Sequence, residues 1–486
     1  MRFTAWLILL VVFVMGVPLA AQQPLVAFPG AEGFGATASG GRGGQVMIVT
    51  TLATEGPGSL AEALATQGAR TIVFEVSGVI DAPAEIIYGD VTIAGQTSPG
   101  GITVRGLICD GHYDANDCDN LIIRHIRSRP ARHIDGFYDI MDDALRLDGV
   151  ENVIIDHVSL ANAADEVAQI SLARNVTVQN TIMGETVGDH AIYGGMLINY
   201  SHSQRPQDRL TIHHNLWYRI TNRYPEISCE MTRNIGEDDA EESPSFCGQQ
   251  PLNIEVSNNL LWDARNAIWY GDNRVGGYGQ PEAGLFLLNM NWVNNLMYTA
   301  PDFTQAMLVD EFINQSKNQL YFSGNRMNLY PDYQDLQLVY CCNDFDQYHP
   351  STLIPAATMR QVRHDFPPIT YTPTEQLTQY MLENVGAFPR DPMDTRYMES
   401  LRSGVIPDVE HERAVADDAL LVGFDPANPP APPLDGDRDG MPDDWESAHG
   451  LDPNTPSHNG LDLSAEGYTN LEVYLNELAE QRVLEK

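Results

Sequence analysis

Acidic residues near the end of the chain recur at the spacing of a calcium-binding loop. The stretch from Asp435 to Glu446 satisfies the pattern D-x-D-x-D-G-x5-E, with Gly440 at the sixth position, where the loop turns sharply. The predicted ligands are Asp435, Asp437, Asp439, the carbonyl of Met441, Asp443 and Glu446. These hard oxygen donors predict a bound Ca2+ ion, which would either stiffen this segment or support its docking to a partner.

The whole chain is strongly acidic. Its 486 residues carry a formal net charge of −38, and Lys317 and Lys486 are its lysines, so arginine supplies nearly all of the positive charge. This charge argues against a nucleic-acid ligand, because phosphate backbones need a basic surface. An acidic polysaccharide would also be repelled unless divalent cations bridge it to the protein. Alternatively, the acidity keeps the protein soluble in a salty medium.

The N-terminus has the features of a secretory signal peptide. Arg2 precedes an apolar run from Ala5 to Val17, which is too short to span a bilayer, and cleavage is expected after Ala21. The mature protein is therefore expected to be secreted, extracellular or periplasmic, without a membrane span. We also expect it to be a monomer.

Cysteine spacing fits an exported protein. Cys109 and Cys118, and Cys229 and Cys247, could each bridge across a short polar loop, whereas the adjacent pair at 341–342 is left unassigned.

The elements that must position any site are short strands in a repeat. Six apolar, β-branched segments each close on His or Asn, with starts 23 to 43 residues apart and no amphipathic helix between them. Such spacing predicts stacked coils of parallel strands rather than alternating strands and helices. Aligning the coils gives one polar column and, beside it, a second. The first contains His125, His157, Asn180, His214, Asn258 and Asn294, and the second contains Asn215, Asn259 and Asn295.

Composition divides the chain into four predicted segments. Residues 1–21 form the signal peptide, residues 22–424 the solenoid, residues 425–434 a proline-rich linker, and residues 435–486 the calcium-binding tail. Within the solenoid segment, Thr372 as N-cap, Pro373 at N1 and Glu375 as capping acid predict a short helix that ends at Asn384.

Several motifs resemble polysaccharide lyase family 1, the pectate lyases. They lie at residues 27–35, 40–44, 56–60, 70–74, 153–157 and 384–391. Their number and order extend the resemblance over roughly residues 25 to 415. The resemblance implies an all-β, right-handed parallel β-helix, to which the tail adds a small calcium-binding appendage. It also implies a groove that binds acidic galacturonan and calcium, and cleavage by β-elimination.

Such an elimination needs a cation to neutralise the uronate carboxylate, and a base. Asp142–Asp143 and Asp165–Glu166 each lie beside a coil strand, one turn apart, so both pairs could face one groove. By resemblance, Asp143 and Asp165 correspond to calcium ligands, with Glu166 adjacent. A further ligand position falls on Gln169, which is not a carboxylate.

The resemblance assigns the base to Arg223, which stands in an Arg-x-Pro step. An arginine base suits alkaline pH, because the ordinary pKa of the side chain is about 12.5 or higher. Relatives usually carry a second arginine just beyond, where this chain has Glu226; Arg219 could replace it if strand alternation persists to Arg223. A substrate-binding lysine is also absent from this region, and His190 or Arg205 is the expected substitute.

Two other classes of protein remain open. A glycoside hydrolase on the same fold would use paired carboxylates as acid and base, and these acids could supply them. A non-catalytic polysaccharide-binding surface protein is the other alternative, since fold alone does not decide function.

Overall fold

The structure is a computed structural model. It describes residues 24–111, 117–130, 143–186, 194–228, 248–270, 287–310, 313–340, 355–407 and 421–485. The predicted signal peptide, residues 1–21, lies outside these residues, as does the predicted pair Cys229 and Cys247. Within them, no helix is both long enough and apolar enough to cross a membrane.

In the described part of the chain, nearly all strands belong to three sheets of parallel strands, here called sheets A, B and C. Sheet A contains β1 (Gln45–Val49), β2 (Arg70–Phe74), β5 (Val91–Ala94), β8 (Leu121–Arg124), β11 (Glu151–Asp156), β14 (Arg174–Gln179), β17 (Asp208–His213), β20 (Pro251–Ser257), β22 (Leu287–Val293), β25 (Gln319–Ser323) and β28 (Thr358–Met359). Sheet B contains β3 (Gly78–Val79), β6 (Ile102–Val104), β9 (Ile126–Ser128), β12 (Ser159–Leu160), β15 (Ile182–Met183), β18 (Leu216–Tyr218), β21 (Leu260–Trp262), β23 (Leu296–Tyr298) and β26 (Arg326–Met327). Sheet C contains β4 (Ala84–Glu85), β7 (Leu107–Asp110), β10 (Leu145–Asp148), β13 (Ala168–Ser171), β16 (Met196–Asn199) and β19 (Glu226–Ile227). A separate pair joins β24 (Leu308–Val309) to β27 (Val339–Tyr340).

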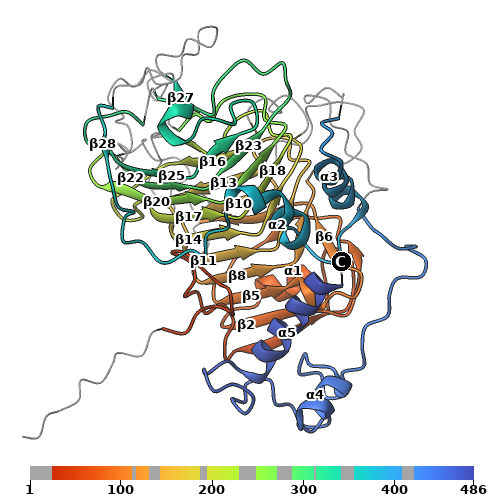
Figure 1. Ribbon diagram of the computed structural model, residues 1–486. Helices are drawn as coiled ribbons and strands as arrows, with labels where there is room; N and C mark the ends of the chain where they lie inside the picture. Colours follow the sequence, from red (N-terminus) through yellow and green to blue (C-terminus); the bar gives the residue numbers. More distant parts are fainter. Residues whose placement is uncertain are drawn as a thin grey trace, which may run out of the picture.

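The chain passes through sheets A, B and C in turn and then begins the next coil. After β8, β9 and β10 it returns to sheet A as β11, which pairs in parallel with β8 (Figure 1). This path is a parallel β-helix, so the predicted solenoid is confirmed. Its right-handed winding stays a prediction, supported by the general preference for right-handed crossovers.

Apolar side chains on alternate strand positions fill the interior of the solenoid. In sheet A, Ile123, Ile155, Val178 and Ile212 stack at equivalent positions and are almost fully buried. Each such burial contributes about 1.5–3 kcal/mol relative to exposure. The opposite strand positions face outward, and in sheet A the N-terminal segment covers some of them, such as Ile122 and Ile154.

The predicted polar columns form the corner between sheets A and B. Asn215 donates from Nδ2 to Asn259 at 3.1 Å, Asn259 donates to Asn295 at 3.1 Å, and Asn295 donates to Asn325 at 3.0 Å. Such a hydrogen bond typically stabilises a fold by about 0.5–1.5 kcal/mol. The residues of the first column all have φ between 50° and 54°, a left-handed conformation in which Asn and His are enriched: His125, His157, Asn180, His214, Asn258 and Asn294.

The short helix after the solenoid is present and ends at Asn384, as predicted. The helical segment consists of η5 (Thr374–Gln376) and α2 (Leu377–Asn384). Leu377 and Met381 pack against the outer face of sheet B, together with α3 (Pro392–Ser403). The helix therefore covers one side of the solenoid.

The predicted cap of this helix is wrong. Pro373, not Thr372, is the N-cap residue, and no side-chain cap bond is present there. Thr372 instead lies 3.0 Å from His214 through its Oγ1 atom, and its carbonyl accepts hydrogen bonds from Asn258 and Asn294. Its polar atoms are thus used to attach this segment to the polar column.

The C-terminal tail is packed against the first coils. Its helices are α4 (Asp443–His449) and α5 (Asn470–Leu484), and α5 lies across β2 and β5 in Figure 1. Leu471 and Leu475 of α5 pack on Val73 and Ala94, which are outward-facing residues of sheet A. At the rim, Arg42 pairs with Glu472 at 2.6 Å. The predicted appendage is therefore a cover over the beginning of the solenoid.

The remaining helical segments in the described residues are short. They are α1 (Leu60–Ala65), η1 (Gly95–Thr97) and η4 (Asp335–Leu338). The predicted disulfide between Cys109 and Cys118 is confirmed, with a Cα–Cα distance of 6.2 Å.

Candidate active site

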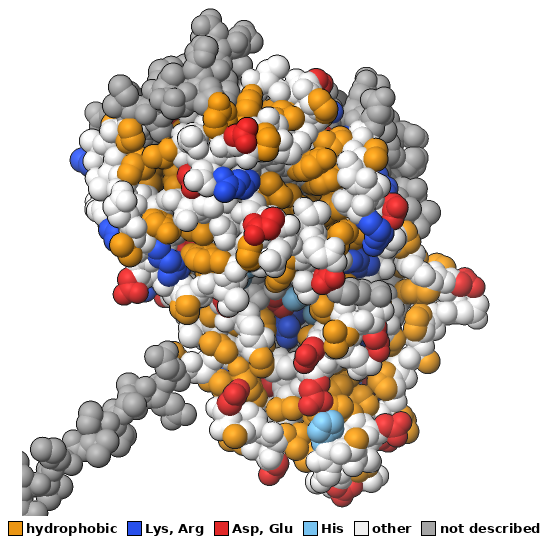
Figure 2. Space-filling model, in the orientation of Figure 1, with side chains coloured by type: hydrophobic (Ala, Val, Ile, Leu, Met, Phe, Trp, Pro, Cys, Tyr) orange, Lys and Arg blue, Asp and Glu red, His pale blue; other side chains and the backbone are white. Residues whose placement is uncertain are grey.

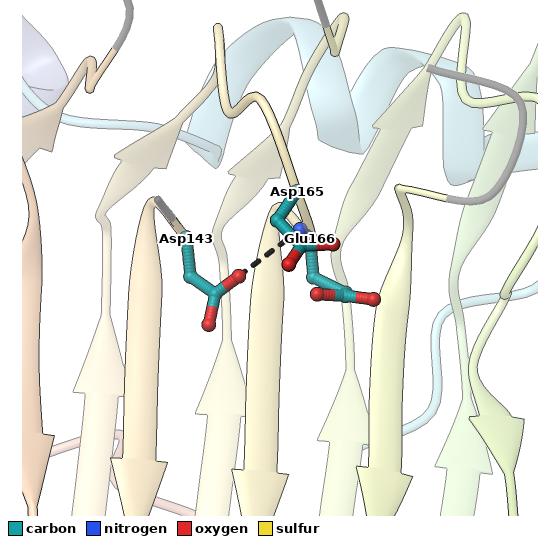
Figure 3. Close-up of side chains that lie close together, drawn as sticks. All are labelled: Asp143, Asp165 and Glu166. Carbon is teal, nitrogen blue, oxygen red and sulfur yellow. Dashed lines mark hydrogen bonds between the residues drawn. The ribbon is translucent and has the colours of Figure 1, made fainter. Parts of the chain in front are cut away.

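Three carboxylates meet where two coils enter sheet C. Asp143 precedes β10, whereas Asp165 and Glu166 precede β13, and one oxygen from each lies within 4.8 Å of the others (Figure 3). The backbone N–H of Glu166 donates to Asp143 at 3.1 Å, which fixes the two coils relative to each other. Asp143 and Glu166 are buried, and Asp165 is partly exposed. The structure thus brings together the three predicted solenoid ligands.

Arg223 reaches this cluster from two coils away. It precedes β19, and its guanidinium forms an ion pair with Glu166 and a second pair, at 3.1 Å, with Glu226. The coil in between enters sheet C through Gly194 and Gly195, which have no side chains to block the path. A Cβ atom at Gly195 would clash with the carbonyl oxygens of Asn222 and Arg223. The glycine pair therefore permits contact between Arg223 and Glu166.

Arg219 does not share a face with Arg223. Strand β18 ends at Tyr218, and both arginines have positive φ, 55° and 64°, so the alternation assumed for residues 219 to 223 does not persist. Arg219 is buried, with its Nε atom 3.7 Å from Glu185 and 3.4 Å from Asp263. These carboxylates neutralise it within the corner that follows sheet B.

The other predicted substrate-binding residues are not brought to the cluster. Arg205 follows β16 and pairs with Asp119 at 2.9 Å. Since the strands of sheet C are parallel and Asp143 precedes its strand, Arg205 lies toward the opposite end of that sheet. Two residues, His190 and Asp142, lie outside the described residues.

The outward face of β10 and β13 extends the polar site. Arg146 donates from Nε to Asp143 at 2.8 Å, and it lies in register with Gln169. Gln169 does not point its amide nitrogen at the cluster but donates it to both oxygens of Asp148, at 3.1 and 3.2 Å. Burial raises the pKa of Asp148 to about 7.

Two adjacent histidines, His213 at the end of β17 and His214 in the polar column, cannot act as ordinary bases. His213 and His214 are buried and bonded to each other through their Nδ1 atoms at 2.8 Å. Burial lowers the pKa of His214 to about 3 and that of His213 well below its usual value. Both are therefore neutral across the working pH range, and they serve the corner structurally.

The tail loop forms a second group of carboxylates. Asp435, Asp437 and Asp439 offer oxygens within 4.8 Å of one another. Both oxygens of Asp437 and both oxygens of Glu446 are buried without a hydrogen-bond partner among the described residues. Burial and the neighbouring aspartates raise the pKa of Glu446 to about 7. Gly440 has φ 89°, as the predicted sharp turn requires.

Sequence reasoning missed three contributors to the solenoid site. In the sequence, Glu226 stands out only as a difference from the family pattern, although its position three residues after Arg223 could have indicated an ion pair. Arg146 lies three residues after Asp143 in a strand whose alternation points it outward. The pair Gly194–Gly195 gives no chemical signal, because its role is to leave space between coils.

Comparisons with known proteins identify relatives over nearly the whole chain. No family model matches the chain. A probable pectate lyase C of Aspergillus flavus is 31% identical over 461 residues, which cover 93% of this chain and 94% of that protein. A probable pectate lyase C of Aspergillus fumigatus is 32% identical over 467 residues, which cover 94% and 95%.

Solved structures are more distant. The cedar-pollen allergen jun a 1 matches with a TM-score of 0.45 and 14% identity, over 74% of this chain and 92% of that one. A pectate lyase of Bacillus sp. N165 in complex with trigalacturonate matches with a TM-score of 0.42 and 12% identity, over 73% and 98%. The fold is therefore established by the strand pairing within this chain and not by these likenesses.

Proposed function

The chain belongs to the pectate lyase family of polysaccharide lyases, and we propose from this membership that it cleaves acidic galacturonan by calcium-assisted β-elimination, with Arg223 as the proton acceptor. The observation that carries the proposal is the contact of Arg223 with the cluster of Asp143, Asp165 and Glu166. Three carboxylates and an arginine, contributed by different coils, meet there. We also propose that the enzyme acts outside the cytoplasm, as the predicted signal peptide implies.

The donors of the cluster suit calcium. Three carboxylates supply hard oxygen atoms, and the partly exposed Asp165 leaves the site open on one side. A bound calcium ion would neutralise the uronate carboxylate and so acidify the proton on the adjacent carbon. Asp143 and Glu166 would hold the ion from buried positions, which limits competition from water.

Arg223 would then take the proton. Its pairs with Glu166 and Glu226 orient the guanidinium. Use of Glu166 as a metal ligand would remove one of these two partners and free part of the guanidinium to face the substrate. Glu226 would keep the guanidinium oriented during the step.

We further propose that the tail loop binds a second calcium ion with a structural role. The unpaired, buried oxygens of Asp437 and Glu446 support this assignment, because buried carboxylates require compensation. The tail packs on the first coils, so the ion would stabilise that contact rather than the chemistry.

Product analysis on polygalacturonate tests the proposed reaction. A lyase leaves an unsaturated sugar end that absorbs ultraviolet light, whereas a hydrolase leaves new reducing ends without that absorbance. We expect absorbance that rises with added calcium and stops on chelation. New reducing ends without absorbance would support the hydrolase, and neither signal would support a non-catalytic binding protein.

A further inference from the structure

One basic side chain lies within the strands of sheet C. Of the strand residues of that sheet that the structure describes, Arg146 alone is basic. Its neighbours Leu145 and Leu147 belong to the buried core, so alternation points Arg146 outward, and 27% of its side chain is exposed. It lies in register with Ile108 on one side and with Gln169 on the other.

Arg146 stands at the edge of the carboxylate cluster. Its Nε atom contacts Asp143 at 2.8 Å, and an Nη atom lies 3.7 Å from Asp110. A guanidinium presents five N–H donors in a planar fork, and two such donors match one carboxylate. An arginine side chain stays protonated in proteins, so Arg146 is cationic.

We propose that Arg146 binds a uronate carboxylate of the substrate, on a sugar next to the one held at the metal cluster. This inference rests on the proposed function. The predicted alternatives do not lie beside the carboxylate cluster, because Arg219 is buried between Glu185 and Asp263, and Arg205 is paired at the other end of sheet C. Arg146 therefore supplies the fixed positive charge that an acidic polymer needs on an acidic face.

The present partner of Arg146 explains how it becomes available. Asp143 accepts the Nε–H of Arg146 and is also a proposed metal ligand. Once Asp143 binds a metal ion, that ion compensates its negative charge. The guanidinium of Arg146 can then form an ion pair with an incoming carboxylate instead. The metal and the substrate would thus bind cooperatively at adjacent coils. A simple counter-ion for Asp143 would not produce this linkage.

The test compares Arg146→Gln and Arg146→Lys with a matched control, Arg174→Gln. Arg174 lies on sheet A and pairs only loosely with Glu151, at 3.9 Å. At saturating calcium, Arg146→Gln is expected to raise the KM for polygalacturonate at least tenfold and to change kcat less than threefold. Arg146→Lys should lose less, because it keeps the charge but not the fork. The control should match the parent enzyme.

Binding gives a readout that does not depend on turnover. Calorimetry with trigalacturonate, in an Arg223→Lys background and with calcium, should show a Kd at least tenfold weaker for Arg146→Gln. The difference should vanish for a methyl-esterified trigalacturonate, which has no carboxylate. Calcium affinity should stay equal or tighten, because a competing cation next to Asp143 is removed.

Two results would overturn the assignment. One is an unchanged KM and Kd in both Arg146 variants. The other is weaker calcium affinity with unchanged trigalacturonate binding at saturating calcium, which would make Arg146 a structural counter-ion. If Arg146→Gln does not fold, Arg146→Lys and the esterified ligand still decide the question. A parent enzyme without lyase activity would instead overturn the proposed function.

Discussion

Carboxylates cluster in two places in the described residues, and the two clusters differ in how the chain brings their residues together. The tail loop takes its acids from twelve consecutive residues, Asp435 to Glu446, with two of its carboxylates buried and unpaired. The solenoid cluster takes Asp143 from one coil and Glu166 from the next, and it receives Arg223 from two coils further on. Among the described residues, no arginine pairs with the carboxylates of the tail loop, whereas Arg223 pairs with Glu166 in the solenoid cluster.

This difference suits the two proposed roles, a structural one for the tail loop and a catalytic one for the solenoid cluster. Buried carboxylates without partners need an ion, so a tail that binds calcium should hold it tightly and keep it. A cluster that already contains arginines can exist without the ion, and it can exchange one partner for another during a reaction. Figure 2 shows that other acidic side chains are scattered over the visible face, as expected if much of the negative charge serves solubility.

Calcium removal should give the largest effect. Chelation is expected to abolish lysis while the solenoid stays folded, because its core is apolar and needs no ion. Activity on polygalacturonate measures the loss of lysis, and circular dichroism on the same sample measures whether the solenoid stays folded. Full activity after chelation would contradict the catalytic role of the solenoid cluster.

Replacement of Arg223 by Lys should reduce kcat at least a hundredfold with little change in KM. An ammonium group keeps the charge but cannot contact Glu166 and Glu226 while it also faces the substrate. Arg174→Lys is the matched control. The parent activity should still rise above pH 8; a plateau near pH 6.5 together with an active Arg223→Lys enzyme would refute the assignment.

Alanine at Gly195 should lower kcat about tenfold by displacing the backbone of Asn222 and Arg223. Calcium affinity should change less, because Asp143 and Asp165 lie on other coils. Gly423→Ala is the control, since a Cβ there would meet its nearest atoms at 3.8 Å. Equal kcat values in the two variants would show that the position of Arg223 does not depend on a glycine at residue 195.

In the tail, Asp437→Asn should leave kcat unchanged and remove a calcium-dependent gain of a few degrees in Tm. Asp437 is the best choice, because Asp435 also accepts backbone hydrogen bonds from Arg438 and Gly440, so its removal would disturb the loop even without metal. Thermal scans with and without calcium measure the effect. Loss of turnover in Asp437→Asn would place the tail in the active site.

The smallest expected effect is the pH dependence of the stability of the tail in metal-free protein. The pKa of Glu446 is raised in the folded protein from about 4.5 to about 7, so the folded state binds the proton more tightly than the unfolded state. Its contribution to stability is present below pH 4.5, is lost as pH rises to 7, and stays lost above. Thermal scans of chelated protein should therefore show a tail that weakens over this interval, and Glu446→Gln should abolish the trend.

The two sites also differ in how far sequence predicts them. The grouping of Asp435, Asp437 and Asp439 follows from spacing alone, because a local loop places its own residues. The polar column and the ladder from Asn215 to Asn295 follow from repeats, because stacked coils keep their register. The contact of Arg223 with Glu166 does not follow, since it depends on how the chain leaves Tyr218 and on two glycines in a third coil.

The packing of α5 has a consequence for biosynthesis. A chain is made from its N-terminus, so the first coils emerge long before residues 470–484. Until then, the outward strip that includes Val73 and Ala94 has no cover. A copy that stops early keeps this strip exposed and is open to aggregation and proteolysis. Helix α5 therefore protects the first coils only in copies in which residues 470–484 have already been made.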